Sequence, residues 1–143
     1  MILALLLAAA VAAACTALRH RLDRPERRES LHLGGRVRLT GMHNRGSAFG
    51  LLHLSRKCLA GVSLVVLLVS LPLCRRSRVG CGLLLGGGAS NLCERLGDAG
   101  VFDYIQFPKA PGRMKRYVYN LADFAIFLGA LLISLSRKTS FRH

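Results

Sequence analysis

The chain has 143 residues, of which 52% are hydrophobic, and a formal net charge of +14. The length suits a single domain, but this hydrophobic content is too high for an ordinary soluble domain that carries 21 Lys and Arg residues. No basic face with interleaved stacking aromatics accompanies the charge, so nucleic-acid binding is not expected. We expect the cations to meet anionic lipid head groups instead.

Four apolar segments follow one another along the chain, at residues 1–18, 59–73, 79–92 and 118–135. A bilayer core of about 30 Å needs roughly 17–20 helical residues, so the middle two segments reach this length only with their flanking residues. The pattern predicts an all-α integral membrane protein, a single domain over residues 1–143 with four transmembrane helices. The expected spans are about 1–18, 58–74, 79–94 and 118–136.

The first segment ends in Ala12-Ala13-Ala14-Cys15, which looks like the cleavage site of a lipoprotein signal peptide. A signal peptide normally opens with positive residues, and no Lys or Arg precedes this apolar run. We therefore expect a retained first helix.

The connections between the segments differ in character. In the first connection, residues 34–40 alternate polar and apolar side chains after a glycine pair, which predicts a small extramembrane β-rich element. The third connection, residues 96–117, is rich in Val, Phe, Tyr and Ile, which favours an interfacial segment. The glycines of the third apolar segment favour close helix packing over a direct part in catalysis.

Five cysteines without CxxC spacing, most of them at or inside apolar segments, do not indicate a disulfide framework. The five histidines are scattered singly, so no metal site is expected. We expect no cofactor.

Two of the seven acidic residues lie inside apolar segments, each three residues after an asparagine. Glu94 follows Asn91, and Asp123 follows Asn120. A carboxylate at the centre of a membrane helix costs roughly 2.5–3.5 kcal/mol and usually faces a bundle interior. Residues three apart share a helix face. With four spans, the first and third connections lie on one side, so both acids and Asn44 converge there.

Two carboxyls close together in a medium of low dielectric cannot both ionise easily, so one of them holds a proton. A carboxylate can then activate water while its protonated partner polarises a carbonyl, which is the chemistry of aspartic proteases. Pairing of each acid with an arginine such as Arg95, or with backbone N–H groups, is the open structural alternative. Asp103 is a reserve candidate, for which we favour a loop-anchoring role.

Four stretches resemble the motifs of the lipoprotein signal peptidases, or signal peptidase II. Residues 44–50 resemble Asn-x-Gly-x-Ala-Phe, residues 86–95 resemble Gly-Gly-Ala-x-Gly-Asn-x-x-Asp-Arg, residues 100–104 resemble Val-Val-Asp-Phe, and residues 119–123 resemble Phe-Asn-x-Ala-Asp. Each motif alone is weak, but the four occur in order on the expected segments. The resemblance therefore spans nearly the whole chain.

The resemblance implies an intramembrane aspartic endopeptidase that cuts prolipoproteins just before a diacylglyceryl-modified cysteine. It maps the two catalytic acids to Glu94 and Asp123, with Glu94 in place of an aspartate. A further family acid falls at Cys15, with Arg19 in the place of a lysine. The substrate-binding residues that the motifs imply are Asn44, Gly46, Ala48, Phe49, Asn91, Arg95, Asn120 and Ala122.

The implied partners are prolipoprotein signal peptides and membrane lipids, and we expect a monomer that crosses the bacterial inner membrane several times. The family orientation puts the first and third connections outside, although they hold 14 Lys and Arg against six in the second connection and the tail. Two alternatives stay open. One is a catalytically silent relative that binds lipopeptides, and the other is a small basic membrane-interaction protein.

Overall fold

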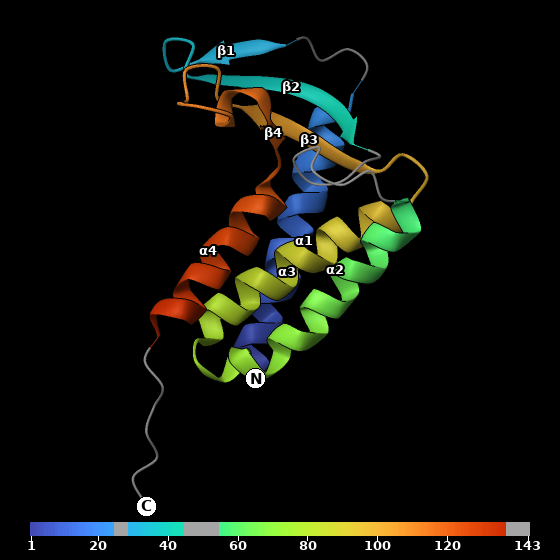
Figure 1. Ribbon diagram of the computed structural model, residues 1–143, viewed down its shortest axis with the longest axis vertical. Coiled ribbons are helices and arrows are strands. Elements are labelled where there is room, and N and C mark those ends of the chain that lie inside the picture. Colours follow the sequence, from blue (N-terminus) through green and yellow to red (C-terminus); the bar gives the residue numbers. More distant parts are fainter. Residues whose placement is uncertain (25–28, 45–54, 137–143) are drawn as a thin grey trace, which may run out of the picture.

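The computed structural model describes residues 1–24, 29–44 and 55–136, and it consists of a helical bundle with a small sheet across one end (Figure 1). The α-helices are α1 (Ile2–Leu22), α2 (Arg56–Ser70), α3 (Arg78–Leu96) and α4 (Leu121–Leu135). The strands are β1 (Ser30–His32), β2 (Val37–Asn44), β3 (Val101–Gln106) and β4 (Val118–Tyr119). Two short 3₁₀ helices are η2 (Leu71–Arg75) and η3 (Met114–Arg116).

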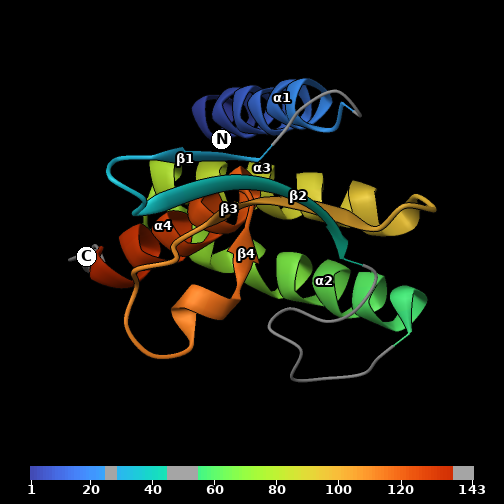
Figure 2. The same ribbon diagram turned by 90° about the horizontal axis from the view of Figure 1, so that it is seen from above.

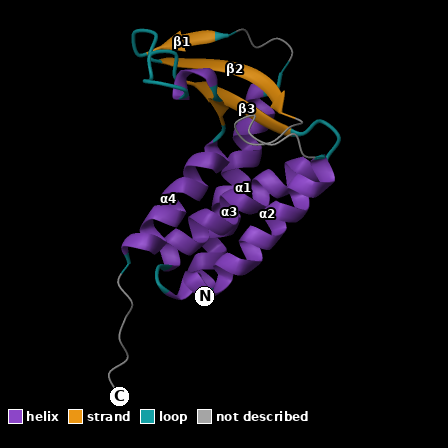
Figure 3. Ribbon diagram, viewed as in Figure 1, coloured by secondary structure: helices purple, strands orange, loops and turns teal. Residues whose placement is uncertain are grey.

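The predicted architecture, mostly helical with a small antiparallel sheet, is confirmed (Figure 3). Within the described residues, two stretches are long and apolar enough to cross a membrane, Ile2–Leu22 and Lys57–Arg75. The apolar helix α4 is shorter, and α3 is less apolar because glycines and polar residues interrupt its leucines. The count of four crossings therefore stays a prediction.

Helix α3 lies between α1 and α2 when the bundle is seen from above, and it also packs against α4 (Figure 2). Its glycines allow these close approaches. A Cβ at Gly86 would lie 2.6 Å from the carbonyl oxygen of Ala8 in α1, and one at Gly87 would lie 2.6 Å from that of Ala122 in α4. The packing role predicted for the glycines is confirmed, because a side chain at either position would push two helices apart.

The sheet is antiparallel in the order β1-β2-β3-β4, and it runs across the helix ends far from the N-terminus (Figure 1). The sequence predicted strand structure in the first connection alone. The third connection in fact supplies β3, so part of the expected interfacial segment is an inner strand of the sheet. Its Val, Phe, Tyr and Ile residues are good strand formers, and long-range pairing of His43 with Phe102 gives them a partner.

The fourth apolar segment also begins differently from the prediction. Val118 and Tyr119 pair with Gln106 and Ile105 in the sheet, and α4 starts only after Asn120. The chain therefore passes directly from the sheet into the bundle at this residue.

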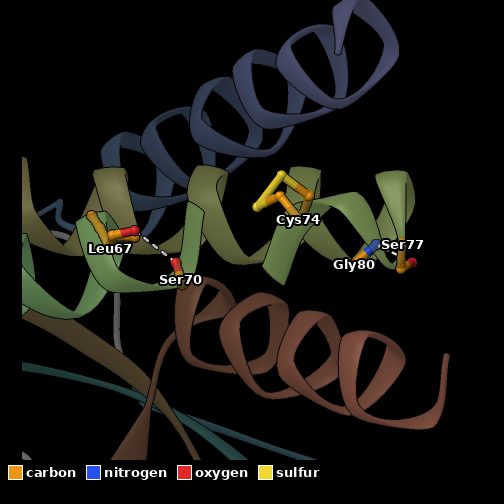
Figure 4. The surroundings of a disulfide bond; sticks show 6 residues. Leu67, Ser70, Cys74, Ser77 and Gly80 are labelled. Carbon is orange, nitrogen blue, oxygen red and sulfur yellow. Dashed lines mark hydrogen bonds between the residues drawn. A yellow bond between two sulfur atoms is a disulfide. The ribbon is translucent and has the colours of Figure 1, made fainter. Parts of the chain in front are cut away.

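One disulfide closes the opposite end of the bundle. Cys74 in η2 and Cys81 in α3 form a disulfide bond, with their Cα atoms 4.7 Å apart (Figure 4). Both cysteines are buried and pack with Ala4. The expectation that the cysteines form no disulfide was wrong for this pair. The tight turn that starts α3, where the Ser77 hydroxyl accepts the Gly80 N–H at 3.0 Å, brings together two cysteines whose spacing carries no signal.

Candidate active site

Asp123 is fixed at the first turn of α4 by a capping box. The Asn120 side-chain oxygen accepts the Asp123 N–H at 2.9 Å, and Asp123 Oδ2 accepts the Asn120 N–H at 3.0 Å. The Asn-Leu-Ala-Asp sequence follows the spacing of this motif, in which two otherwise unpaired N–H groups are satisfied. Asn120 is thus the cap of the helix and not a residue on its face. The carboxylate stands at the positive end of the helix dipole.

Asn91 joins α3 to this carboxylate. Its Nδ2 donates to Asp123 Oδ1 at 3.0 Å, so the two oxygens of Asp123 accept from different elements. Asn91 is 8% exposed, and its own side-chain oxygen is buried with no hydrogen-bond partner among the described residues. The sequence predicted that Asn91 stands over Glu94. In the structure, Asn91 instead makes an interhelical hydrogen bond to Asp123, and its Oδ1 has no donor among the described residues.

Asp103 lies in β3 and is only 4% exposed. Its Oδ1 accepts from Asn120 Nδ2 at 2.8 Å, and its Oδ2 accepts from Asn44 Nδ2 at 3.1 Å. Asn120 therefore contacts both aspartates, Asp103 through its side chain and Asp123 through its backbone. These contacts bring strands β2 and β3 and helix α4 to one point.

Burial raises the pKa of Asp103 from its usual 3.8 to about 6. The two asparagine amides oppose this rise, because they donate hydrogen bonds to the charged form. The negative charges of Asp123 and Glu94 add to it. A carboxyl that changes protonation near pH 6 is well suited to proton transfer under physiological conditions.

Glu94 has a different surrounding. Its Oε2 accepts the backbone N–H of Phe102 at 2.8 Å, so the carboxylate ties the end of α3 to β3, one residue before Asp103. This is the backbone hydrogen bond that the structural alternative foresaw. The positive charge of Arg19 also acts on it. Glu94 is close enough to Asp123 and Asp103 to influence both electrostatically.

The remaining predicted site residues divide into three groups. Arg95 is half-buried, and its guanidinium interacts electrostatically with the Asp123 carboxylate. Ala122 is buried where its carbonyl faces α3, which is a packing position. Gly46, Ala48 and Phe49 lie outside the described residues.

Cys15 takes the place that the resemblance gives to a family acid. It is buried in α1, its thiol is in hydrogen-bonding contact with the Ser90 side chain, and it is near the charges of Glu94 and Asp123. A small, weakly polar group therefore borders the site from the α1 side. Within the described ranges, no three His, Cys, Asp or Glu side chains are placed to hold a metal ion together.

Two further contacts position the site, and sequence reasoning missed both. The Tyr104 hydroxyl accepts the Leu121 N–H at 2.9 Å, which links β3 to the first turn of α4. Tyr104 is 2% exposed, and burial raises its pKa to about 12, so the phenol stays neutral. The signal for it in the sequence was slight, a single hydroxyl in a short strand that also carries Asp103 and Gln106.

The second contact joins α1 to β2. His43 Nε2 lies 3.1 Å from Asp23 Oδ1, and the imidazole packs against the Phe102 ring in a tilted arrangement, with the centroids 5.0 Å apart and the ring planes at 50°. His43 precedes Asn44, so this contact holds the strand end from which Asn44 reaches Asp103. Neither residue belonged to any recognisable motif.

The fold is one that solved bacterial membrane enzymes share. One such structure superposes with a TM-score of 0.79 over 98% of this chain and 91% of its own, at 18% identity. A second superposes with the same TM-score over 96% of this chain and 93% of its own, at 17% identity. At these identities the likeness concerns the fold.

The family follows from the sequence comparisons. The family model described as Signal peptidase (SPase) II matches residues 2–137. The lipoprotein signal peptidase of Moorella thermoacetica is 33% identical over 108 residues, which cover 71% of this chain and 68% of that protein. That of Caldicellulosiruptor bescii is 34% identical over 107 residues, 71% of this chain and 67% of that protein. The chain belongs to the signal peptidase II family, as its motifs predicted.

Proposed function

We propose that this protein removes signal peptides from diacylglyceryl-modified prolipoproteins by aspartic-type hydrolysis within the membrane. The relatives are lipoprotein signal peptidases, which supports the substrate class. The observation that carries the chemistry is the double contact of Asn120, which hydrogen-bonds to Asp103 and to Asp123. Two acids joined by one residue can exchange protons with a substrate bound between them.

The geometry favours Asp103 as the partner of Asp123, where the sequence favoured Glu94. The Oε2 of Glu94 already accepts the Phe102 N–H, which ties this carboxylate to the backbone of β3. Asp103 shares Asn120 with Asp123 and has a pKa near 6. We assign Glu94 the task of holding β3, and with it Asp103, against α3.

In the proposed mechanism, Asp123 acts as the carboxylate. Burial opposes its charged form, whereas the N-terminus of α4, the hydrogen bonds from Asn91 and Asn120, and the positive charge of Arg95 favour it. Asp123 takes a proton from water as the water oxygen adds to the scissile carbonyl, and protonated Asp103 gives its proton to the carbonyl oxygen. When the tetrahedral intermediate collapses, Asp123 passes its proton to the leaving nitrogen, and Asp103 regains a proton from the new carboxyl group.

Asn91 is the residue best suited to hold the substrate backbone. Its buried oxygen has no partner among the described residues, and a peptide N–H would satisfy it. Asn44 and Asn120 hold Asp103, so we assign them to orienting the acid more than the substrate. Arg95, Gly46, Ala48 and Phe49 remain proposed substrate contacts.

We propose four membrane crossings, with the sheet on the outer side of the bacterial inner membrane. The exposed apolar side chains on the helices, such as Val65 and Val69 in α2 and Phe127 in α4, support contact with lipid. In this placement the aspartates lie where the helices meet the sheet, within reach of a signal peptide that ends at the outer surface.

The test is cleavage by the purified protein in detergent or nanodiscs, with a diacylglyceryl-modified prolipoprotein as substrate and the unmodified precursor as control. Cleavage of the modified form alone supports the proposal. Binding of the modified form without cleavage would point to a silent relative, for which the thiol of Cys15 in the place of a family acid is a specific reason. If the protein neither binds nor cleaves the modified form, the proposal is contradicted.

A further inference from the structure

Two segments far apart in the sequence form one surface at an end of the sheet. Lys109 Nζ donates to the Gly34 carbonyl at 2.7 Å, which ties the third connection to the turn between β1 and β2. Gln106 Nε2 donates to the Lys115 carbonyl at 3.0 Å, and Gln106 also faces Arg38 across the β2–β3 pair. We name residues 31–38 and 107–117 the basic tip.

The basic tip carries charge of one sign. It contains six Lys and Arg residues and no Asp or Glu: Arg36, Arg38, Lys109, Arg113, Lys115 and Arg116. All of them are exposed except the half-buried Arg38. Among nearby acids of the first connection, Asp23 pairs with His43, and Glu29 accepts a hydrogen bond from Thr40. The hydrogen bond from Thr40 leaves the charge of Glu29 in place, but this one exposed carboxylate beside the tip cannot neutralise its six cations.

The same surface exposes large apolar side chains. Leu33 is 75% exposed, Leu31 is 61% exposed and Met114 is 50% exposed. Leucines and cations side by side are typical of segments that lie in the interface of a membrane, where the apolar groups enter the lipid and the cations stay with the phosphates. A solvent-facing hairpin has no need of the leucines, and a surface that binds nucleic acid by stacking would need exposed aromatic rings.

The position of the tip agrees with this chemistry. The strands run across the ends of the helices, and the turn between β1 and β2 lies above α4 in Figure 1. With the helices in the bilayer, as proposed above, the sheet lies at the depth of the head groups. Lys and Arg residues at this depth are attracted to anionic lipids, and guanidinium groups form paired hydrogen bonds with phosphate oxygens.

We propose that the basic tip is a binding surface for the head groups of anionic phospholipids. It anchors the sheet to the membrane at the end from which β4 leads directly into Asn120. An anionic lipid bound at the tip therefore restrains the strand that carries the chain into the active site. This inference rests on the membrane placement proposed above and does not depend on cleavage.

The test uses a tryptophan reporter, because the chain contains no Trp. The variant Leu33→Trp is reconstituted in nanodiscs that hold phosphatidylcholine and phosphatidylglycerol, with a nitroxide on the head group of one lipid or the other at equal mole fraction. We expect stronger quenching of the reporter by labelled phosphatidylglycerol than by labelled phosphatidylcholine, and we expect salt to reduce the difference. Equal quenching by the two lipids, or none by either, overturns the proposal.

Two charge variants in the Leu33→Trp background distinguish an effect of the charge at the tip from an effect of the protein's net charge. Arg113→Gln, Lys115→Gln and Arg116→Gln together should abolish the preference for phosphatidylglycerol. The matched control neutralises three exposed arginines at the other end of the bundle, Arg75→Gln, Arg76→Gln and Arg78→Gln, and should keep the preference. Loss of the preference in both variants, or in neither, contradicts the proposal.

Prolipoprotein cleavage is measured on the same discs as an independent readout. A protein that keeps the lipid preference but does not cleave would argue against the proposed function alone. A protein that cleaves without any lipid preference would argue against the tip alone.

Discussion

The two ends of the bundle are built from different chemistry. All seven acidic residues lie in 23–29, 94–103 and at 123, so none occurs in the residues that form the end opposite the sheet. That end is closed by the Cys74–Cys81 disulfide and by packing around Ala4. The sheet end is held by asparagine amides and carboxylates. The disulfide stabilises its end of the bundle without burying any charged group. The buried carboxylates at the sheet end cost free energy, and a function best explains why they are there.

The strongest way to test this difference is to neutralise Asp123. We expect Asp123→Asn to reduce kcat by about 10²–10⁴-fold, the usual contribution of a general acid or base. The amide oxygen can still accept the Asn120 N–H, and a flip of the Asn91 amide would let its unpaired oxygen accept the new side-chain NH2 group. The thermal unfolding temperature should therefore change little. Cleavage of a modified prolipoprotein together with a melting curve gives both quantities. Activity close to that of the wild type would rule out Asp123 as the base.

A pair of substitutions decides between the two partners of Asp123. Asp103→Asn should lower kcat as strongly as Asp123→Asn does, because the proton donor is lost. Glu94→Gln should retain most activity, because a glutamine oxygen can still accept the Phe102 N–H. The opposite ranking, with Glu94→Gln inactive and Asp103→Asn active, would restore the pairing that the sequence suggested. Rates for both variants under identical conditions provide the comparison.

The pH profile should carry the signature of Asp103. Its folded pKa of about 6 lies above the usual 3.8, so the protonated form is favoured in the folded protein. Below pH 4 the stability associated with this proton is fully present, and it is lost as the pH rises through about 6. We expect kcat/KM to fall above pH 6, because the acid is then ionised. In Asp103→Asn the unfolding temperature should lose this pH dependence, whereas a profile that rises through pH 6 would reverse the assigned roles.

At the opposite end, loss of the disulfide should lower the stability of the protein and leave the cleavage rate unchanged. Replacing Cys74 and Cys81 by serine should lower the free energy of unfolding by roughly 2–3 kcal/mol, because a short covalent loop no longer restricts the unfolded chain. Cleavage at a temperature where the variant is folded should match the wild type. Thermal unfolding with and without reductant measures the first effect. A selective loss of activity in the folded variant would show that the two ends are coupled.

The smallest effect is expected at Tyr104. Tyr104→Phe removes the acceptor of the Leu121 N–H, which should lower the free energy of unfolding by about 1 kcal/mol. It should also reduce kcat modestly, with little change in KM, because the start of α4 loses one restraint. Val118→Ala, also a single truncation near the α4 junction but without a hydrogen bond to α4, is the control. An equal kcat loss in both variants would deny the hydroxyl a positioning role.

Local patterns predicted half of the site. The Asn120 and Asp123 spacing is a local signal. With four predicted spans, the first and third connections lie on one side, which was enough to predict that Asn44, Asn91 and Asp123 lie near one another. The sequence predicted only a loop-anchoring role for Asp103, because residues 101–106 resemble an interfacial segment when they are considered alone. Their burial depends on β2, more than 55 residues earlier in the chain, and no local period reports such a pairing. Asn91 was assigned to Glu94 because both lie on one helix, but the nearer acceptor belongs to α4.

The same distinction explains the sheet and the disulfide. The alternation in residues 34–40 predicted a strand because its signal is local, whereas β3 and β4 were missed because their partners are distant. Cys74 and Cys81 are seven residues apart, and only the 3₁₀ turn before α3 makes that separation suitable for a bond. Four membrane crossings and the lipid contacts of the helices remain predictions from the apolar segments.

Because the sheet takes strands that precede α2 and strands that follow α3 in the sequence, the proposed catalytic centre cannot form in a partly synthesised chain. Asp103 arrives with β3, but Asn120 and Asp123 enter only with β4 and the first turn of α4. Until α4 has been made, Asp103 and Asp123 are not joined through Asn120. A nascent or truncated molecule therefore lacks the proposed catalytic pair, which forms only when the whole bundle has been assembled.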